Sequence, residues 1–427
     1  MRKRYAVCGV SNRAIAMYIK PIMESFSNSA ELVGLLDIDP LRFKVCSDRV
    51  PQVKDIPTYL ANDFGKMIEE QKPDALIVVC MDCAHQYYII EGLKLGLDVI
   101  TEKPMTTNTA DALRVREAEK NSKGNVICTF NYRYNPVHTK LKEMILAGKI
   151  GRVTHVDLNW YIDIHHGASY FNRWNRMREN SGSLSIHKAS HHFDLVNWWI
   201  DGIPQEVHAF GALNHYGPNG VFNPSKKNGR HCKECPEKKN CAYQRRFTSR
   251  KDGSFMDSHL AAFQGTEKCY SNYTPDMCIF DEEINIHDTI VANVRYKNGA
   301  FLNYSANFST PYEGYRLAIN GTHGRLETTE FGGVGRSIIA DYHGGSQFID
   351  YYPIFEGRER IHVPQSGGGH GGGDPKILED IFLGEDPDRT YDILAKSVDG
   401  LRAISIGDAV YNSIVNGGVQ DLSSFME

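Results

Sequence analysis

The stretch HQYYIIEGLKLGLDVITEKPMTTN, residues 85–108, places a helical pattern directly before an apolar strand and a charged triplet. We expect a helix that starts at His85 and a buried strand that begins at Asp98. Lys103 then stands at the carboxyl end of a parallel strand, the edge of an open α/β sheet where ligands bind. An ammonium group there can bond a substrate hydroxyl and stabilise developing alkoxide character. A simple salt bridge to Glu102 is the structural alternative.

The same alternation of strand and helix runs through the first part of the chain. Strand patterns occupy residues 5–8, ELVGLLDID (31–39) and DALIVVC (74–80), and a helical pattern occupies FGKMIEEQ (64–71). Strands that alternate with helices at this spacing predict an α/β domain with a parallel, doubly wound sheet.

The turn after the first strand predicts a nucleotide-binding loop. Gly9, Ser11 and Ala14 stand where a dinucleotide loop has G-x-G-x-x-G. Small residues there let backbone N–H groups approach a pyrophosphate at a helix N-terminus. Asp37 ends the second strand, where a carboxylate can accept both ribose hydroxyls of NAD and would repel the 2′-phosphate of NADP. The alternative is that Asp37 is only a turn residue before DPLR.

Composition limits the class of protein. The chain has 427 residues, 41% of them hydrophobic, and its 48 Lys and Arg against 52 Asp and Glu leave a net charge of -4. It is long enough for two domains, and the balanced charge argues against a nucleic-acid partner. The N-terminus lacks the apolar run of a signal peptide, and no stretch approaches the ~20 apolar residues that span a bilayer. We therefore expect a cytoplasmic enzyme with no membrane partner.

A second segment, SLSIHKASHHFDLVNWW (183–199), combines titratable groups with a pattern suited to burial. On a continuous helix, His187, His191 and Asp194 are spaced i, i+4, i+7 and share one face. The adjoining stripe carries Lys188 and His192. A metal site, an acid–base cluster, or satisfied histidines at a domain interface would each fit this pattern. Acid–base chemistry is favoured, because the ordinary pKa of imidazole, ~6.5, lies near working pH.

These motifs together resemble the Gfo/Idh/MocA family (glucose–fructose oxidoreductase, inositol dehydrogenase, MocA). The resemblance runs nearly end to end and includes residues 85–108, FNYRYNP (130–136), IGRVTHVDL (150–158), residues 183–199 and GLRAISIGDAVYNSIVNG (400–417). It implies an N-terminal Rossmann domain over residues 1–130. It also implies a C-terminal α/β domain over 131–375, with a large open, mostly antiparallel sheet whose exposed face supports a homo-oligomer, a dimer or tetramer. Helices in 376–427 would pack back on the Rossmann domain.

The resemblance also implies an activity: hydride transfer between NAD(P) and a hydroxyl carbon of a sugar, polyol or keto-sugar. Lys103 matches the active-site lysine of the family, and Pro104 the proline that often follows a cis peptide. His191 matches the family histidine that takes the hydroxyl proton, and Asp194 an aspartate that orients it or holds a neighbouring hydroxyl. His187 replaces the usual earlier aspartate, which makes the site more cationic.

Two other activities remain open for such a chain. Some relatives keep NAD bound and hydrolyse glycosides by transient oxidation, elimination, water addition and re-reduction. A ligand sensor without catalysis is the third reading, which the intact Lys103, His191 and Asp194 disfavour.

We expect the following contacts with ligands. The cofactor-binding residues are Gly9, Ser11, Asn12, Arg13, Asp37, Asp82, His85, Glu102 and Lys103. The substrate-binding residues are Arg133, Arg173, Trp174, Lys188, His192 and His370. Arg173 and Trp174 belong to WYIDIHHGASYFNRWNR (160–176), predicted as an active-site loop, and His370 to the glycine-rich GGGHGGGDP (367–375), predicted as a flexible loop.

Ten cysteines are present, and their spacing suggests a metal site in an insertion near residues 228–280. Cys232, Cys235 and Cys241 follow the pattern C-x2-C-x5-C, and Cys278 is a fourth candidate ligand, with Cys269 as its rival. A subset of the family carries similar cysteines. Four thiolates would form a closed structural zinc site. An iron–sulfur cluster or disulfides are the alternatives.

Overall fold

The computed structural model describes residues 2–225, 230–243, 269–332, 346–364 and 366–426. Part of the predicted cysteine-rich insertion therefore lies outside the described residues. The chain divides into two compact units. The first is built from described residues within 1–135, 268–273 and 366–404, and the second from those within 136–267, 274–365 and 405–427.

The first unit contains a seven-stranded sheet in the order β15-β6-β5-β4-β1-β2-β3. Its strands are β1 (Lys3–Cys8), β2 (Ala30–Asp37), β3 (Thr58–Leu60), β4 (Ala75–Val78), β5 (Asp98–Thr101), β6 (Val126–Cys128) and β15 (Ala395–Lys396). All are parallel except β15, which pairs antiparallel with β6. The predicted doubly wound parallel sheet is confirmed.

The first unit has helices between its parallel strands and one more, α14, before β15. They are α1 (Asn12–Ala14), which continues through a π-helical turn (Ile15–Ile19) into α2 (Lys20–Glu24), then α3 (Leu41–Arg49), α4 (Phe64–Gln71), α5 (Asp82–Lys94), α6 (Thr109–Lys120) and α14 (Gly369–Leu383). A 3₁₀ turn, η4 (Asn131–Tyr134), follows β6. The predicted helix at His85 begins three residues earlier, at Asp82. The strands β1 and β4 are buried almost throughout, as expected when helices cover both faces of a parallel sheet.

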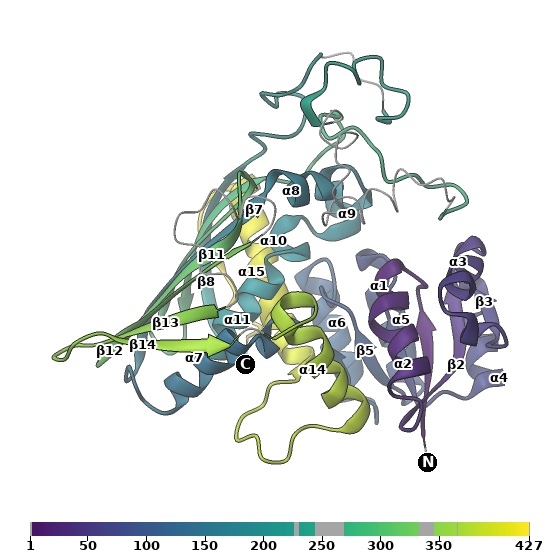
Figure 1. Cartoon of the computed structure of the whole chain (residues 1–427), viewed down its shortest axis with the longest axis horizontal. Coiled ribbons are helices and arrows are strands. Elements are labelled where there is room, and N and C mark those ends of the chain that lie inside the picture. Colours follow the sequence, from purple (N-terminus) through teal and green to yellow (C-terminus); the bar gives the residue numbers. More distant parts are fainter. Residues whose placement is uncertain (1, 226–229, 244–268, 333–345, 365, 427) are drawn as a thin grey trace. The chain divides into compact units, whose positions relative to one another are not determined.

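The second unit contains a nine-stranded sheet in the order β14-β13-β12-β11-β7-β10-β9-β8-β16. Its strands are β7 (Val153–Asp163), β8 (Pro204–Ala212), β9 (Thr289–Tyr296), β10 (Phe301–Thr310), β11 (Glu313–Gly321), β12 (Gly324–Gly332), β13 (Ser346–Pro353), β14 (Glu359–Pro364) and β16 (Gln420–Asp421). Figure 1 shows this sheet as the broad fan of long strands. Only β7 and β10 pair in parallel among the described strands of this sheet, so the predicted mostly antiparallel sheet is confirmed.

Helices of the second unit cover the buried face of its sheet. They are α7 (Pro136–Leu146), α8 (Ile164–Phe171), α9 (Arg178–Ser181), α10 (Leu184–His187) and α11 (Ser190–Ile200), and the unit boundary falls within α15 (Ser397–Asn416). Every residue of α11 is buried. Phe193 packs against Tyr304 of β10 with ring centroids 4.8 Å apart, and Trp199 donates its indole N–H to the carbonyl of His138 on α7.

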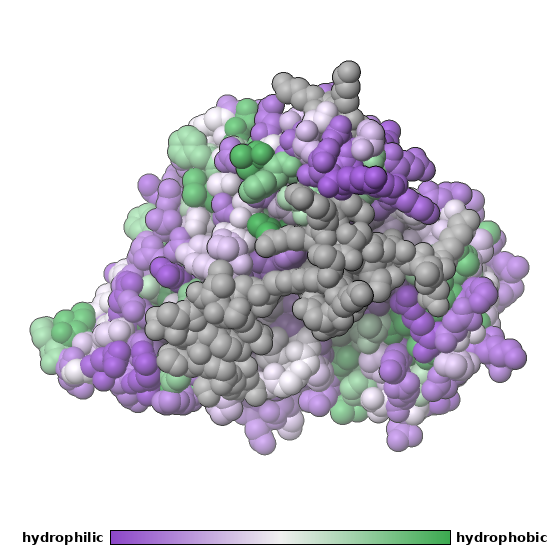
Figure 2. Space-filling view, turned by 45° about the horizontal axis from the view of Figure 1, so that its top comes forward, coloured by the Kyte–Doolittle hydropathy of each residue, from purple (hydrophilic) through white to green (hydrophobic). Residues whose placement is uncertain are grey.

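The distribution of hydrophobic residues on the visible surface is typical of a globular protein. In the view of Figure 2 it is mostly hydrophilic, with hydrophobic residues in small scattered patches. Within the described ranges, none of the helices combines the length and apolar character that crossing a membrane demands.

Candidate active site

The loop after β1 requires glycine at its first position. Gly9 has a φ of +97°, and a Cβ atom there would lie 2.5 Å from the Cα of Cys80. Ser11 then caps the helix, since its Oγ accepts a hydrogen bond of 3.1 Å from the backbone N–H of Ala14. A close backbone approach followed by a helix N-terminus is the arrangement that receives a pyrophosphate. The residues around Gly9 therefore fit a dinucleotide.

Asp37 turns its carboxylate back toward this loop. Its oxygens accept hydrogen bonds from the backbone N–H groups of Val10 (2.7 Å) and Asp39 (2.9 Å). Burial raises the pKa of Asp37 above its usual value, and these two hydrogen bonds partly offset the rise. Asp37 is thus held rigidly at the carboxyl end of β2, where a dinucleotide's ribose hydroxyls would find acceptors.

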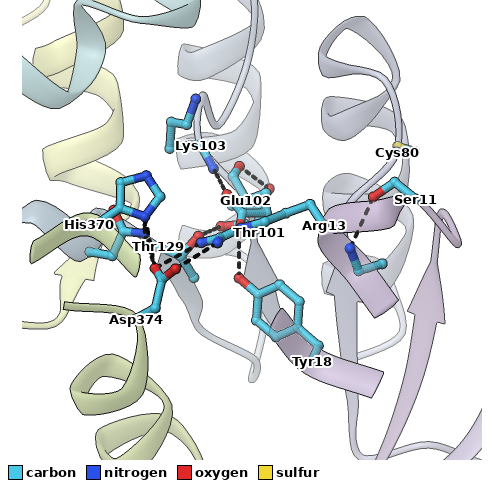
Figure 3. Close-up of polar contacts among 12 residues, drawn as sticks. Ser11, Arg13, Tyr18, Cys80, Thr101, Glu102, Lys103, Thr129, His370 and Asp374 are labelled. Atoms are coloured by element: carbon cyan, nitrogen blue, oxygen red, sulfur yellow. Dashed lines mark hydrogen bonds and ion pairs between the residues drawn. The ribbon is translucent and has the colours of Figure 1, made fainter. Parts of the chain in front are cut away.

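Glu102 lies at the centre of a charged network in the first unit (Figure 3). It accepts hydrogen bonds from Arg13 Nε at 2.8 Å and from the Tyr18 hydroxyl at 3.0 Å. Arg13 also binds both carboxylate oxygens of Asp374, at 2.9 and 3.1 Å. Burial raises the pKa of Glu102, but the adjacent Arg13 guanidinium outweighs burial and holds the pKa below its usual range. The network joins the nucleotide loop, the β5 edge and the start of α14.

Lys103 follows this network at the carboxyl edge of the sheet. The Lys103–Pro104 peptide is cis, as the resemblance implies. The backbone N–H of Lys103 donates to Glu102 Oε2 at 3.3 Å. Burial lowers the pKa of the Lys103 ammonium, and the nearby Asp82 and Glu102 carboxylates oppose this effect. Arg13 and Tyr18 both bond Glu102 Oε1, and in Figure 3 the Lys103 side chain extends away from Glu102.

His370 is held beside the same network by an unusual backbone. Its φ is +53°, a left-handed conformation that is uncommon outside glycine, and Gly371 and Gly372 share it. The His370 Nδ1 atom lies 3.0 Å from Asp374 Oδ1 and 3.0 Å from Asn131 Nδ2. In the view of Figure 3, the His370 ring and the Lys103 side chain both extend upward from the row of charged groups.

The predicted flexible loop at residues 367–375 is therefore better described as a left-handed turn that enters α14. Gly371 is required there, because a Cβ atom would lie 2.2 Å from Asn135 Nδ2. Gly373 is required as well, since its Cβ atom would meet the Asn131 carbonyl at 2.2 Å. Close packing on Asn135 and Asn131 explains these two glycines without invoking flexibility.

We expect the Asp374→Asn substitution to destabilise the protein by about 1–3 kcal/mol, because the amide presents N–H groups to the donors of Arg13. Arg13 and His370 hold the pKa of Asp374 well below its usual range despite burial. The stabilisation is therefore present above the unfolded-state pKa, ~3.9, and is lost as pH falls below it. Urea unfolding at neutral and acidic pH measures both effects. The exposed Asp48, which pairs with Lys44 on α3, provides the control Asp48→Asn. Equal loss in the two variants would contradict the expectation.

The remaining predicted cofactor residues have mixed surroundings. Asn12 Oδ1 accepts from Arg42 and Arg49, both at 2.9 Å. Asp82 is buried in the first turn of α5. Its carboxylate is near enough to Lys103 to oppose the lowering of the Lys103 pKa by burial. His85 is buried with its ring nitrogens 2.8 Å from the Pro104 carbonyl and 3.2 Å from the Cys80 carbonyl. His85 thus ties two loops of the sheet edge together.

In the second unit, the segment 183–199 is not one continuous helix, so that prediction is wrong. The helix α10 ends at His187, and α11 begins at Ser190. Ala189 donates its N–H to the carbonyl of Leu184, five residues earlier, which widens the turn and breaks the i, i+4 register. Ser183, with a φ of +80°, starts the first helix. His187 consequently does not share a helix face with the residues of α11.

His191 and Asp194 do share a face of α11, since they lie three residues apart on one helix. Each is 1% exposed. His187 instead contacts a different set, with its Nε2 3.0 Å from Asn175 Nδ2 and its ring edge-on to Tyr170 and Trp174. The predicted group of three is therefore not kept together on one helix face. His191 and Asp194 form a pair on α11, and His187 lies among aromatic residues.

His192 lies in the core of the second unit, and its assignment as a substrate ligand stays a prediction. Its ring stacks on Trp160 with centroids 3.8 Å apart, and its Nδ1 lies 2.8 Å from the Tyr304 hydroxyl. Lys188 lies near the same tryptophan, with Nζ 5.8 Å from the ring centroid.

Arg133, in the first unit, is also interior and is 2% exposed. Its guanidinium contacts the Asp399 carboxylate at 3.4 Å and the Ile393 carbonyl at 3.4 Å, so it holds η4 against the first turn of α15 and the chain just before it. The predicted loop 160–176 is largely helical, because α8 fills residues 164–171. Arg173 bonds the carbonyl and hydroxyl of Ser169 at the end of that helix, and Trp174 is half-buried.

Two family models cover most of the chain. The model described as an oxidoreductase family NAD-binding Rossmann fold matches residues 3–130, and the model of the oxidoreductase family C-terminal alpha/beta domain matches residues 142–421. The chain belongs to the Gfo/Idh/MocA oxidoreductase family.

Relatives within this family differ in their similarity. The oxidoreductase YteT of Bacillus subtilis (strain 168) is 52% identical over 414 residues, which cover 96% of each chain. An inositol 2-dehydrogenase of Acidothermus cellulolyticus is 28% identical over 181 residues, 42% of this chain and 49% of that one. A structure of levoglucosan dehydrogenase with NADH and levoglucosan has a TM-score of 0.65 at 15% identity, over 99% of this chain and 100% of that chain. This last likeness concerns the fold.

The zinc site predicted for this Gfo/Idh/MocA chain is not confirmed. An antiparallel bridge between His231 and Met277 brings Cys232 and Cys278 into one neighbourhood. All ten cysteines are nevertheless unbridged, and no group of three or more His, Cys, Asp or Glu within the described ranges is arranged to hold a metal ion. The rival Cys269 belongs to the first unit, where its carbonyl accepts from Arg42. We derive no chemistry from zinc.

Sequence reasoning missed the partners that hold the predicted residues. Tyr18 on the π-helical turn, Asn131 on η4 and Asp374 on α14 all join the Arg13–Glu102 network. The only sequence signal was the compact GGGHGGGDP, whose aspartate follows His370 by four residues. Nothing in the local sequence relates Arg13 to a residue 361 positions away.

Proposed function

We propose that the chain is an NAD-dependent oxidoreductase that transfers hydride between the nicotinamide and a hydroxyl-bearing carbon of a sugar or polyol, or the corresponding keto-sugar. The observation that carries the proposal is Lys103, held at the carboxyl edge of the sheet by the cis peptide and by Glu102. Membership of the oxidoreductase family supports the reaction type. The inositol and levoglucosan dehydrogenases among the similar proteins support the substrate class.

The residues around Gly9 would hold the dinucleotide. We assign the pyrophosphate to the backbone N–H groups after Gly9 and the adenosine ribose to Asp37. NAD, when bound, supplies the acceptor for the hydride. Arg42 is buried and already bonded to Val10, Asn12 and Cys269, so it would not balance the charge of a 2′-phosphate beside Asp37. This arrangement favours NAD over NADP.

The side chains would accept the proton of the substrate hydroxyl and stabilise the negative charge that develops on its oxygen. We assign His191 as the base that takes the substrate hydroxyl proton at an imidazole nitrogen, while the hydride leaves the same carbon. Asp194, on the same helix face, would orient the imidazole or hold a neighbouring hydroxyl. The Lys103 ammonium would donate to the substrate oxygen as it loses its proton. His187 and Lys188 would bind substrate hydroxyls, and Arg173, Trp174 and His370 complete the set of proposed contacts.

We expect Asp37→Ala to raise the NAD dissociation constant roughly 10- to 100-fold, because two charged hydrogen bonds to the ribose are lost. The preference for NAD over NADP should shrink as well. Titration of NADH and NADPH fluorescence measures both. Asp48→Ala, on the exposed side of α3, is the control. An unchanged dissociation constant in Asp37→Ala would remove Asp37 from the ribose site.

A second candidate function is NAD-dependent glycoside hydrolysis, favoured by the His370–Asp374 pair. An imidazole oriented by a carboxylate provides a second acid–base group in the unit that holds Lys103. After hydride leaves a ring carbon, such a base can remove the proton from the adjacent carbon as the aglycone leaves. Water then adds to the double bond, and return of the hydride restores the alcohol.

A panel assay distinguishes the two candidates. The purified chain is mixed with NAD and with free sugars, polyols and chromogenic glycosides, while reduced nicotinamide and released aglycone are followed together. Net reduced cofactor with a free sugar supports the dehydrogenase. NAD-dependent aglycone release without net reduction supports the glycosidase. Neither signal with any compound would contradict both and favour a ligand sensor.

We also propose that the exposed face of the second sheet joins copies of this chain. Phe210 on β8 lies opposite Val291 on β9, and both side chains are exposed, as is Phe301 on β10. Exposed apolar side chains on a sheet face are typical of an interface. Sedimentation that finds only monomers at micromolar concentration would contradict this.

The cytoplasmic location of the protein stays a prediction.

A further inference from the structure

The short segment Cys269–Tyr273 belongs to the first unit, although the described residues on both sides of it in the chain, 230–243 and 274–332, belong to the second. It packs on the loop that follows β2, between Asp37 and α3. Asp37, the residue assigned to the adenosine ribose, ends β2 and directly precedes this loop. The segment is therefore part of the nucleotide-binding unit, even though it lies in the predicted cysteine-rich insertion.

Two sets of contacts attach the segment to the β2 loop. Ser271 donates to the Asp39 carboxylate twice, from its backbone N–H at 2.7 Å and from its hydroxyl at 2.6 Å. Arg42 donates to the Cys269 carbonyl at 2.9 Å, and the Tyr270 ring lies over its guanidinium, with the centroid 4.7 Å from Cζ. Burial raises the pKa of Asp39, but the Ser271 hydrogen bonds, together with the Leu41 N–H and the Arg42 guanidinium, keep the pKa below its usual value.

Arg42 connects the segment directly to the nucleotide loop. It is 1% exposed, and its remaining N–H groups donate to the Val10 carbonyl and to Asn12 Oδ1, both at 2.9 Å. Val10 in turn donates its N–H to Asp37 at 2.7 Å. One buried guanidinium thus joins the segment 269–273 to the residues proposed to contact pyrophosphate and ribose.

We propose that the segment Cys269–Tyr273 forms part of the wall of the adenosine pocket and slows the release of NAD. The proposal rests on the assignment of Asp37 to the ribose. An adenosine group beside Asp37 would lie against the loop that the segment covers, so departure of the cofactor would require these contacts to loosen. Tyr270 also offers an aromatic face on which an adenine can stack.

The test measures NADH dissociation directly. The full-length chain is loaded with NADH and mixed with excess NAD, and the loss of nicotinamide fluorescence gives the dissociation rate. We expect the Tyr270→Ala and Ser271→Ala double variant to release NADH roughly tenfold faster, since a cation–π contact and a charged hydrogen bond are lost. Tyr270→Phe keeps the ring and should release NADH at the wild-type rate.

A matched control exists in the second unit. Like Ser271, Ser423 donates to one carboxylate from both its backbone N–H and its hydroxyl, in this case to Asp421 Oδ1 two residues earlier in the chain. Ser423→Ala should leave the dissociation rate unchanged. An unchanged or slower rate in the double variant would overturn the proposal. Failure of the wild-type chain to bind NADH would overturn the cofactor assignment, and the pocket wall with it.

Discussion

Replacing His191 by asparagine is expected to lower kcat by about 10²- to 10⁴-fold, the usual contribution of a general base. The NADH dissociation constant should stay unchanged, because the dinucleotide contacts are assigned to residues of the first unit. Steady-state kinetics with the best substrate of the panel, and NADH titration of the same sample, measure the two quantities.

The adjacent histidine provides the control for folding effects. His192 stacks on Trp160 and bonds Tyr304, so His192→Asn should lower the thermal unfolding temperature while retaining most of kcat. A similar loss of kcat in both variants, with similar loss of stability, would mean that His191 acts through packing. Wild-type turnover in His191→Asn would remove it from the proton transfer.

The second large effect is expected at Lys103. Lys103→Met should lower kcat/KM by about 10²- to 10³-fold, the cost of losing a donor to a developing oxyanion. Because burial lowers the pKa of Lys103, activity that needs the ammonium should fall on the alkaline side below ~10.4, the ordinary lysine value. The pH profile of kcat/KM measures this limb in the wild-type chain.

Two variants make the Lys103 result specific. Lys103→Arg keeps the positive charge and should move the alkaline limb to higher pH, because guanidinium does not deprotonate in this range. Lys94→Met, on the exposed end of α5, should change nothing, since Lys94 only pairs with Glu91. An alkaline limb that persists in Lys103→Arg would assign that titration to another group.

Much of the first unit could be predicted because its signals are local. Runs such as residues 75–78 are buried on both faces, so they read as continuous apolar strands, and the intervening helices carry their own patterns. Alternation alone then placed Gly9, Asp37 and Lys103 at the carboxyl edge of one sheet. The structure brings these residues to that edge through the pairing of β2, β1, β4 and β5.

The details that escaped prediction depend on tertiary packing. Both α10 and α11 carry buried apolar residues, so the apolar pattern of the sequence continues across the break between them. The pattern therefore predicted one helix where the structure has two. The burial of His192 and Arg133 depends on partners that are distant in the sequence, namely Tyr304 on β10 and Asp399 on α15. Spacing also cannot tell whether four cysteines adopt ligand geometry, which requires the angles between them.

The central claim is hydride transfer between a carbohydrate carbon and the nicotinamide, and a single-turnover experiment tests it most directly. The chain with stoichiometric NAD is mixed with the best substrate, and reduced nicotinamide absorbance is followed over milliseconds, with protiated substrate and with substrate deuterated at the oxidised carbon. The account predicts formation of reduced nicotinamide, lasting or transient, that slows with the deuterated substrate. Product formation with bound NAD that never becomes reduced would contradict it.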